Sequence, residues 1–388
     1  MVNTDHSSAT HPDYPRTIRG AVLQDIGRAR PYATSQPIVV REVHLNRPGP
    51  GEIMVRIEAA GICHSDLSVV DGNRPRPVPM LLGHEAAGIV EELGVGVTDL
   101  ALGDRVVMTF LPRCGDCTGC RSNGKTPCEI GTLANSAGEL LGGATRLSVD
   151  GKPLHHHLGV SGFATHAVVS RRSVVRVGSD VPAPVAAIFG CALLTGGGAV
   201  LNVLNPQPGE SLAVVGLGGV GMAAVVTAVA TGVERIVGVD SQPAKLEMAQ
   251  RLGATEVYTP EEAASAGVKV SGAIEAAGHP RALESAIALT APGGTTVTVG
   301  LPAPKQVAYF DPLALVAEAR SVVGSYLGSA VPEIDIPIYE TLWREGRLDV
   351  DGLISSTIDL DAINEAMDTL ADGRALRQII TFHEGSPA

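Results

Sequence analysis

A glycine-rich hexapeptide, GLGGVG at residues 216–221, constrains the fold of this chain more than any other feature. It fits the pattern G-x-G-x-x-G, follows the apolar run SLAVV and opens the apolar segment VGMAAVVTAVA, so it joins a buried strand to a helix. Asp240 ends the next apolar run, RIVGVD, 19 positions after Gly221. Strand, glycine turn, helix, strand and acidic residue together predict a βαβ unit that binds a dinucleotide.

The residues of this motif have separate physical roles. Gly216 makes the tight turn, Gly218 brings backbone amides close to a pyrophosphate at the helix N-terminus, and Gly221 permits close packing of helix on strand. Asp240 can accept hydrogen bonds from ribose hydroxyls and would repel a 2′-phosphate, which favours NAD over NADP. The alternative is a glycine-rich turn that binds no ligand.

Apolar patterning predicts the domain organisation. Short apolar runs between glycines and prolines indicate a β-rich region up to about residue 177, and strands alternating with helices follow from about residue 182. We expect a doubly wound parallel sheet inserted into a β-rich domain, whose last part returns near the C-terminus. The expected boundaries are a mobile tail at 1–17, the catalytic domain at 18–192, its cysteine lobe at 112–130, the cofactor domain at 193–328 and the rejoining part at 329–388.

Charge and hydropathy exclude some function classes. The 388 residues include 29 Lys and Arg against 41 Asp and Glu, a net charge of −12 that argues against non-specific nucleic-acid binding. We expect no membrane span, because no apolar run of about 18 residues stands out, and the polar N-terminus does not resemble a signal peptide. These features favour a cytoplasmic protein.

Four of the six cysteines stand close together in CGDCTGCRSNGKTPC. Their spacing allows four thiolates to close around one tetrahedral ion, as in structural zinc sites. An iron–sulfur cluster is the rival interpretation, but the usual proline after the last cysteine is absent. Four free, buried cysteines are the remaining alternative. The candidate ligands are Cys114, Cys117, Cys120 and Cys128.

The two other cysteines suggest a second metal site. Cys63 and His84 lie in one stretch, residues 61–88, with acidic neighbours, and Cys191 follows much later. Two thiolates and one imidazole leave a fourth coordination position open, which is the composition of a catalytic zinc site. Taken alone, Cys191 is better explained as a small core residue of an Ala-rich helix.

With these motifs in place, the chain resembles the zinc-dependent medium-chain alcohol dehydrogenases, and their longer liver-type branch in particular. The segments that carry the resemblance are GICHSD, GHEAAG, the four-cysteine lobe, GCALLTG, GLGGVG, VDSQPAK and RQIITF, and it extends over nearly the whole chain from about Thr17. It implies a Rossmann domain inserted into a GroES-like catalytic domain. It also implies two zinc ions per chain, one catalytic at Cys63, His84 and Cys191, and one structural.

The resemblance also implies roles for individual residues. Asp66 would orient His84, Glu85 would lie behind the metal, Ser65 would pass on the alcohol proton, and His64 would face the pyrophosphate. The expected cofactor contacts are His64, Thr195, Gly216, Gly218, Gly219, Val220, Gly221, Asp240, Lys245, Val299 and Arg377. The expected substrate pocket is formed by Ser65, Phe110, Leu133, His157, Leu158, Leu301 and Tyr326. Taken alone, Lys245 and Arg377 would be ordinary surface groups.

Three positions depart from the family pattern. Ser68 stands where a relay histidine is common, so the proton path must end elsewhere, through water or His64. His157 replaces an aromatic residue and is either a polar group near the substrate or simply the third of three histidines on a strand. Arg74 aligns with the pocket mouth and, with Arg76, could attract an anionic substrate, or it is an exposed loop arginine.

We therefore expect an NAD-dependent zinc alcohol dehydrogenase that interconverts a primary or secondary alcohol and its aldehyde or ketone. The alternatives are a thiol-dependent, formaldehyde-type dehydrogenase and a non-catalytic NAD-binding redox sensor. The former is less favoured because the segment GTLAN near Leu133 lacks the arginine of that branch. We expect a homodimer, with a homotetramer as the alternative.

Overall fold

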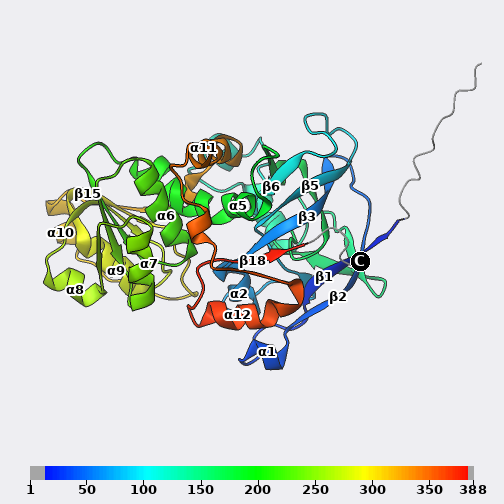
Figure 1. Cartoon of the computed structure of the whole chain (residues 1–388), viewed down its shortest axis with the longest axis horizontal. Coiled ribbons are helices and arrows are strands. Elements are labelled where there is room, and N and C mark those ends of the chain that lie inside the picture. Colours follow the sequence, from blue (N-terminus) through cyan, green and yellow to red (C-terminus); the bar gives the residue numbers. More distant parts are fainter. Residues whose placement is uncertain (1–13, 383–388) are drawn as a thin grey trace, which may run out of the picture.

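A computed structural model describes residues 14–382, and one of its sheets is entirely parallel. Its strand order, β13-β12-β11-β14-β15-β16, places the first strand of the glycine motif at the centre, as in doubly wound dinucleotide-binding folds. This confirms the predicted parallel sheet, which lies on the left in Figure 1. The strands are β11 (Ser211–Val215), β12 (Arg235–Val239), β13 (Glu256–Tyr258), β14 (Val270–Glu275), β15 (Thr290–Thr298) and β16 (Ser321–Gly324).

Burial on both faces explains why β11 is a continuous apolar run. Leu212 and Val214 belong to the core under α6, whereas Ala213 and Val215 face the core that includes α8 and α9. Successive side chains of a strand point to opposite faces, so both faces need apolar residues when helices cover each of them. The helices of this domain are α6 (Gly219–Ala230), α7 (Pro243–Arg251), α8 (Pro260–Ser265), α9 (Pro280–Leu289) and α10 (Pro312–Ala317).

The β-rich domain lies on the right in Figure 1 and contains a closed barrel, β1-β2-β7-β8-β4, and a mixed sheet, β10-β6-β5-β3-β18-β17, with β9 paired to β3. The C-terminal strand β18 is antiparallel to β3, which confirms that the end of the chain returns to the first domain. The strands are β1 (Arg16–Leu23), β2 (Ile38–Leu45), β3 (Glu52–Ile62), β4 (Met80–Leu81), β5 (Ala86–Leu93), β6 (Arg105–Met108), β7 (Leu147–Val149), β8 (Lys152–His156), β9 (His166–Ser170), β10 (Val174–Val177), β17 (Ser356–Ile358) and β18 (Gln378–Thr381).

Strand β1 begins earlier than the sequence predicted. Arg16 and Thr17 pair with Leu45 and His44 of β2, so the end of the expected tail is part of the barrel. The backbone hydrogen bonds of this pairing favour the strand over a free tail. Residues 1–13 of the expected tail lie outside the described residues.

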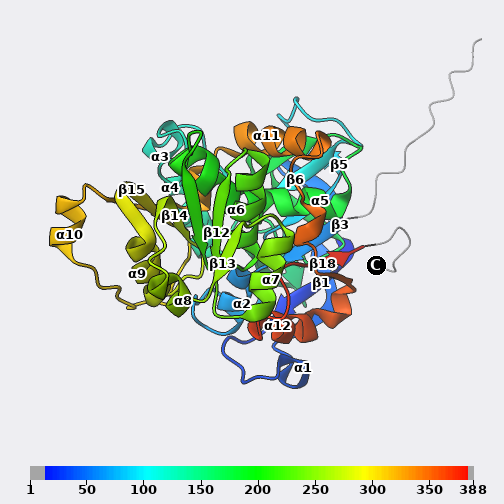
Figure 2. The ribbon, with the colours of Figure 1, turned by 60° about the vertical axis from the view of Figure 1, so that its left-hand side comes forward.

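The other helices cover the edges of the two domains. In both views α12 lies beside α2 and α1 (Figures 1 and 2), and contacts between their residues agree. These helices are α1 (Tyr32–Ser35), α2 (His64–Val70), α3 (Thr118–Arg121), α4 (Glu129–Ala137), α11 (Pro332–Arg344) and α12 (Ile363–Ala371). Short 3-10 turns are η1 (Arg171–Ser173), η4 (Leu327–Ser329), η5 (Asp351–Leu353) and η6 (Leu360–Ala362).

One long helix connects the domains. It consists of α5 (Ala183–Ile188) and two π-helical segments, η2 (Phe189–Gly197) and η3 (Ala199–Leu204). Its glycines permit close packing, since a Cβ on Gly196 would lie 2.1 Å from the carbonyl oxygen of Val220 in α6. The domain boundary expected between residues 192 and 193 therefore falls inside a continuous helix.

The same helix corrects one expectation from hydropathy. Residues Ala183–Leu204 are long and apolar enough to cross a membrane, with a mean hydropathy of 1.8, so the expectation that no such stretch exists was wrong. In the fold 72% of its most apolar window is buried inside the protein. Its composition is explained by packing against α6 and the catalytic domain.

Candidate metal and cofactor sites

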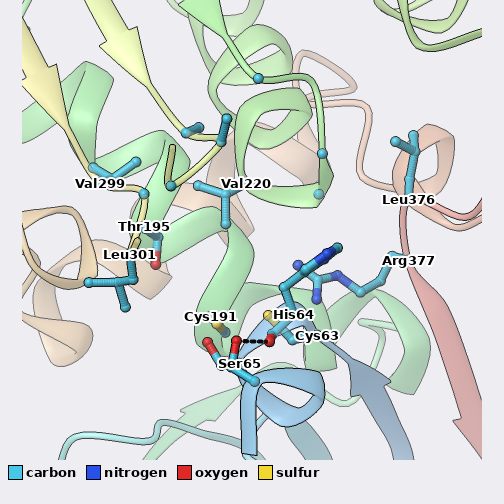
Figure 3. Close-up of a pocket in the computed structure, with 18 of the residues that line it drawn as sticks. Cys63, His64, Ser65, Cys191, Thr195, Val220, Val299, Leu301, Leu376 and Arg377 are labelled. Carbon is cyan, nitrogen blue, oxygen red and sulfur yellow. Dashed lines mark hydrogen bonds between the residues drawn. The ribbon is translucent and has the colours of Figure 1, made fainter. Parts of the chain in front are cut away.

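Three side chains of the types that bind metals come together from three separate elements. Cys63 and Cys191 line the base of a cavity, as Figure 3 shows, and His84 lies against them. Cys63 directly precedes α2, His84 lies between β4 and β5, and Cys191 lies in the π-helical segment η2. The Sγ atom of Cys191 is 3.4 Å from Nε2 of His84, and the donor atoms of all three lie within 4.8 Å of one another. A carboxylate oxygen of Glu85 also lies within 4.8 Å of these donor atoms. Two thiols and an imidazole in a buried place fit a zinc ion whose fourth position is left for a substrate or for Glu85.

Hydrogen bonding distributes the protons of this cluster unequally. The hydrogen bond with Cys191 lowers the pKa of Cys63 well below its ordinary value, and the positive charges of Arg377 and His84 act in the same direction. The same hydrogen bond, together with burial, raises the pKa of Cys191. A thiolate at Cys63 is the form that a metal ion binds.

Asp66 orients His84 from behind. Its Oδ1 lies 2.9 Å from Nδ1 of His84, and its Oδ2 accepts the backbone N–H of Cys63 at 3.0 Å. Although burial alone would lower the pKa of His84, the charge of Asp66 raises it well above its ordinary value. When the ring gives up one proton to bind a metal, this hydrogen bond keeps the remaining proton on Nδ1 and makes Nε2, the atom that faces Cys191, the ligand atom.

Glu85 and Arg377 form a buried pair behind the cluster. Nη1 of Arg377 lies 3.4 Å from a carboxylate oxygen of Glu85 and donates to the carbonyl of Ile62 at 3.1 Å. Burial raises the pKa of Glu85 to about 7. Arg377 also reaches the start of α6, since a Cβ on Gly219 would lie 2.8 Å from its Nη2. It therefore lies at the helix N-terminus where a pyrophosphate would bind.

The four-cysteine lobe brings its four sulfurs within 4.8 Å of one another. Backbone N–H groups of Cys114, Gly115, Cys120 and Gly131 donate to these sulfurs, each at 3.3 Å. A backbone hydrogen bond from Cys120 lowers the pKa of Cys117 to about 6, whereas burial raises the pKa of Cys120 to about 12. Four convergent sulfurs with amide donors fit a closed, four-thiolate metal site.

The glycine turn has the shape that its motif predicts. Gly216 has a φ of 94°, in the left-handed region that glycine adopts without strain. A Cβ on Gly221 would lie 1.9 Å from the carbonyl oxygen of Gly216, whereas a Cβ on Gly218 would meet nothing within 4 Å. Gly221 therefore allows close packing, and the open space at Gly218 adjoins the cavity.

Asp240 closes the other end of this turn. Its carboxylate accepts the backbone N–H of Leu217 at 2.8 Å and of Gln242 at 3.0 Å, and Nζ of Lys245 lies 3.8 Å away. These contacts fix the carboxylate at the end of β12, beside the cavity. A fixed negative charge there suits a ribose diol and opposes a phosphate on the same ring.

One cavity of about 280 Å³ joins the metal cluster to the glycine turn. Figure 3 shows Leu301, Thr195 and Val299 on one side and Arg377 on the other, with Ser65 near Cys63 and Cys191 below. The residues expected from the sequence that line it are Cys63, His64, Ser65, Phe110, Cys191, Thr195, Gly216, Gly218, Gly219, Val220, Asp240, Lys245, Val299, Leu301, Tyr326 and Arg377.

The structure does not bring three expected pocket residues into this cavity. Leu133 is 68% exposed on α4, because that helix turns Gly131, Ala134 and Asn135 inward and Leu133 outward. Leu158 is buried but does not line the cavity. His157 lies just beyond β8 rather than on the strand, behind His84, with Nδ1 3.2 Å from Oδ1 of Asp66.

Other lining residues were missed by the sequence reasoning. Three of them, Ala276, Ala277 and Gly278, directly follow β14. Their position could have been predicted from the sequence, because ligands in parallel sheets bind at the carboxyl ends of the strands. Leu376 and Leu370 come from the C-terminal part, and no local motif marks them. Gly300 and Leu327 were missed as well. Ser68 and Arg74, which the sequence analysis placed at the relay position and at the pocket mouth, also line the cavity, and the Ser68 hydroxyl donates to the carbonyl of His64 at 2.8 Å.

Comparisons with known proteins agree with both domains. Residues 49–179 match the family model for an alcohol dehydrogenase GroES-like domain, and residues 219–343 match that for a zinc-binding dehydrogenase. Alcohol dehydrogenase 1 of Pisum sativum is 33% identical over 365 residues, which cover 91% of this chain and 96% of the relative.

Two solved structures extend this similarity to three dimensions. An alcohol dehydrogenase zinc-binding domain protein from Burkholderia ambifaria is 33% identical, with a TM-score of 0.88, and the match covers 95% of this chain and all of that one. Benzyl alcohol dehydrogenase from Acinetobacter calcoaceticus is 30% identical with a TM-score of 0.86, over 95% of this chain and all of that one.

Proposed function

The chain belongs to the zinc-dependent medium-chain alcohol dehydrogenase family, and we propose that it catalyses the reversible oxidation of a primary or secondary alcohol with NAD as the hydride acceptor. The observation that carries this proposal is the convergence of Cys63, His84 and Cys191 at the base of the cavity that the glycine turn borders. The donor set and the glycine turn adjoin one space, so residues that would hold a metal and residues that would hold a dinucleotide face the same cavity.

Cys63, His84 and Cys191 would hold a zinc ion, and the four-cysteine lobe would hold a second one. At the first site zinc supplies Lewis acidity, which lowers the pKa of a bound alcohol towards neutrality. The contact between Asp66 and Nδ1 of His84 orients the imidazole ring so that Nε2 faces the site. The Ser65 hydroxyl lines the cavity beside Cys63 and can relay the proton that the alcohol loses, accepting it while donating its own proton towards the cofactor ribose.

The cofactor would bind along the turn, with its pyrophosphate at the N-terminus of α6 between Gly218 and Arg377. NAD supplies the hydride-accepting ring. Asp240 would hold the adenosine ribose, which supports the preference for NAD over NADP. Thr195 and Val299 lie on the far side of the cavity from Arg377, where they would abut the nicotinamide (Figure 3).

The relatives support an alcohol or aldehyde substrate, one of them being a benzyl alcohol dehydrogenase. Phe110 and Tyr326 line the cavity, and their rings meet edge to face with centroids 5.9 Å apart, which provides an apolar wall. The comparisons favour neither the thiol-dependent formaldehyde-type activity nor a non-catalytic redox sensor.

The experiment compares the wild-type protein with Cys191→Ala and Cys117→Ala. We expect two zinc ions per wild-type chain by elemental analysis and one in each variant. Cys191→Ala should stay folded and bind NAD but lose turnover with alcohols, whereas Cys117→Ala should lose thermal stability because it opens the lobe. Turnover by Cys191→Ala at the wild-type rate would contradict the assignment of the catalytic site.

Two further properties remain proposals. We propose a homodimer, supported by the exposed edge strand β16 with Val322 and Val323 each 37% exposed, and light scattering should then give twice the mass of one chain. A fourfold mass would favour the tetramer. The cytoplasmic location expected from the sequence stays a prediction.

A further inference from the structure

Arg74 lines the cavity without belonging to the metal cluster or the glycine turn. It lies in the loop after α2, where its backbone N–H donates to the carbonyl of Ser68 at 2.7 Å, and it is half-buried. It also lines a neighbouring hollow, together with Leu301 and Pro302. Arg74 therefore stands where the cavity opens towards solvent and contributes a cation to that opening.

The guanidinium of Arg74 has no hydrogen bond and no ion pair among residues 14–382. The nearby carboxylate of Asp71 instead accepts the backbone and side-chain N–H groups of Asn73, both at 2.8 Å. Arg76, two positions on, donates to the carbonyl of Asn135 at 3.2 Å. In a chain with 41 acidic and 29 basic residues, a half-buried arginine without a carboxylate partner has donors left for a ligand.

Arg74 lines the cavity together with Tyr326, Phe110 and Cys63. Burial lowers the pKa of Arg74, and the titratable groups close enough to act on it are Tyr326, Arg76 and Cys63. The charge of Cys63 also acts on His64, but His64 is in addition close to Lys245 and Arg377 of the cofactor end. Tyr326 packs on Phe110, which packs on the metal ligand His84 with ring centroids 5.5 Å apart. Arg74 thus faces the part of the cavity that an alcohol would occupy.

We propose that Arg74 selects substrates that carry a carboxylate at the end remote from the reacting carbon, so that the enzyme acts on hydroxy acids or on the corresponding oxo acids. This inference rests on the proposed alcohol dehydrogenase activity. A planar guanidinium matches a planar carboxylate in a bidentate pair, and partial burial strengthens that pair relative to one in water. The rings of Phe110 and Tyr326 would contact the apolar part of such a substrate.

The test compares matched substrates. One series consists of ω-hydroxycarboxylates of increasing length against primary alkanols of the same length, and one aromatic pair is para-hydroxymethylbenzoate against benzyl alcohol. The kcat/KM of each is measured with NAD for the wild-type protein and for Arg74→Leu, Arg74→Lys and Arg281→Leu. Arg281→Leu removes a positive charge from an exposed position in α9 and is the matched control.

We expect the wild-type protein to prefer the carboxylate member of at least one pair. Arg74→Leu should reduce that preference, the ratio of the two kcat/KM values, by about tenfold to a hundredfold, the range of a charged hydrogen bond. Arg74→Lys should retain part of the preference for the carboxylate, and Arg281→Leu should retain all of it. Added salt should raise the KM of the carboxylate substrate and leave the KM of the neutral alcohol unchanged.

The opposite results are equally clear. Turnover of neutral alcohols with no preference for any carboxylate, or an equal loss on both members of a pair in Arg74→Leu, would overturn the role of Arg74 and leave the dehydrogenase activity intact. No turnover of any alcohol by a zinc-loaded wild-type protein would instead contradict the proposed function itself.

Discussion

Replacing Asp66 with asparagine should weaken zinc binding at Cys63, His84 and Cys191 without unfolding the protein. Both carboxylate oxygens face donors, the Nδ1–H of His84 at 2.9 Å and the backbone N–H of Cys63 at 3.0 Å, and Nδ1 of His157 lies 3.2 Å from the oxygen that faces His84. Asparagine has the same shape but offers one acceptor oxygen and one NH₂ group. One of the two buried donors must therefore face another donor.

Either orientation of the amide has a cost. If its NH₂ faces His84, Nδ1 of that ring must accept a hydrogen bond instead of donating one. The ring proton then moves to Nε2, the atom that should bind the metal. If its NH₂ faces Cys63, a buried backbone N–H loses its acceptor, which costs about 1–3 kcal/mol. Both routes agree with a loss of about tenfold to a hundredfold in metal affinity when a group behind a ligand is changed.

The assay is equilibrium dialysis of Asp66→Asn against zinc buffers, with elemental analysis of each fraction. The four-cysteine lobe serves as an internal reference, because its zinc should stay bound at the same free zinc concentration as in the wild-type protein. Asp361→Asn is the matched control, since Asp361 pairs with Arg19 at the surface. Equal zinc affinity of Asp66→Asn and the wild-type protein at the first site would refute the reasoning.

Two further predictions concern the cofactor and acid stability. Asp240→Asn keeps an acceptor for the backbone N–H of Leu217 or Gln242 but removes the negative charge that would repel a 2′-phosphate. The ratio of kcat/KM with NAD to kcat/KM with NADP should therefore fall by about tenfold or more. An unchanged ratio would argue against Asp240 as the residue that discriminates between the two cofactors. Burial lowers the pKa of His156 to about 3, so the folded state binds fewer protons than the unfolded state below the ordinary pKa of about 6.5. Stability should therefore fall by about 2 kcal/mol through this residue between about pH 7 and about pH 5. Urea unfolding of His156→Gln, whose amide oxygen can still accept the backbone N–H of Arg146, should lack that part of the loss, and identical pH profiles would exclude His156 as its source.

Features that are local in the sequence were predictable from it. The spacing of glycines in GLGGVG determines which backbone atoms meet in the turn, and Gly221 packs on the carbonyl of Gly216 as the motif requires. The four cysteines of the lobe lie within 15 consecutive residues, so a short loop suffices to bring their sulfurs together. In both cases spacing along the chain translates directly into distance in space.

Predictions that depend on which side of an element faces a cavity were less successful. The resemblance predicts Leu133 in the pocket wall, but α4 turns its side chain outward. The apolar run Ala183–Leu204 went unrecognised as a possible span, and its true role is to pack between two domains. The exposure of Leu133 and the burial of this helix cannot be predicted from the local sequence, because each depends on the surfaces that the neighbouring elements present.

The sequence by itself determined that the chain contains a dinucleotide-binding βαβ unit, a four-thiolate lobe and the residue types for a second metal site. Only the tertiary structure decided that Cys191, 107 positions from His84, lies 3.4 Å from it. It also decided that Arg74 reaches the same cavity without a partner of its own. The reason is physical, since a ligand set assembled from a strand loop, a helix N-terminus and a π-helix depends on how whole domains pack, which no local pattern records.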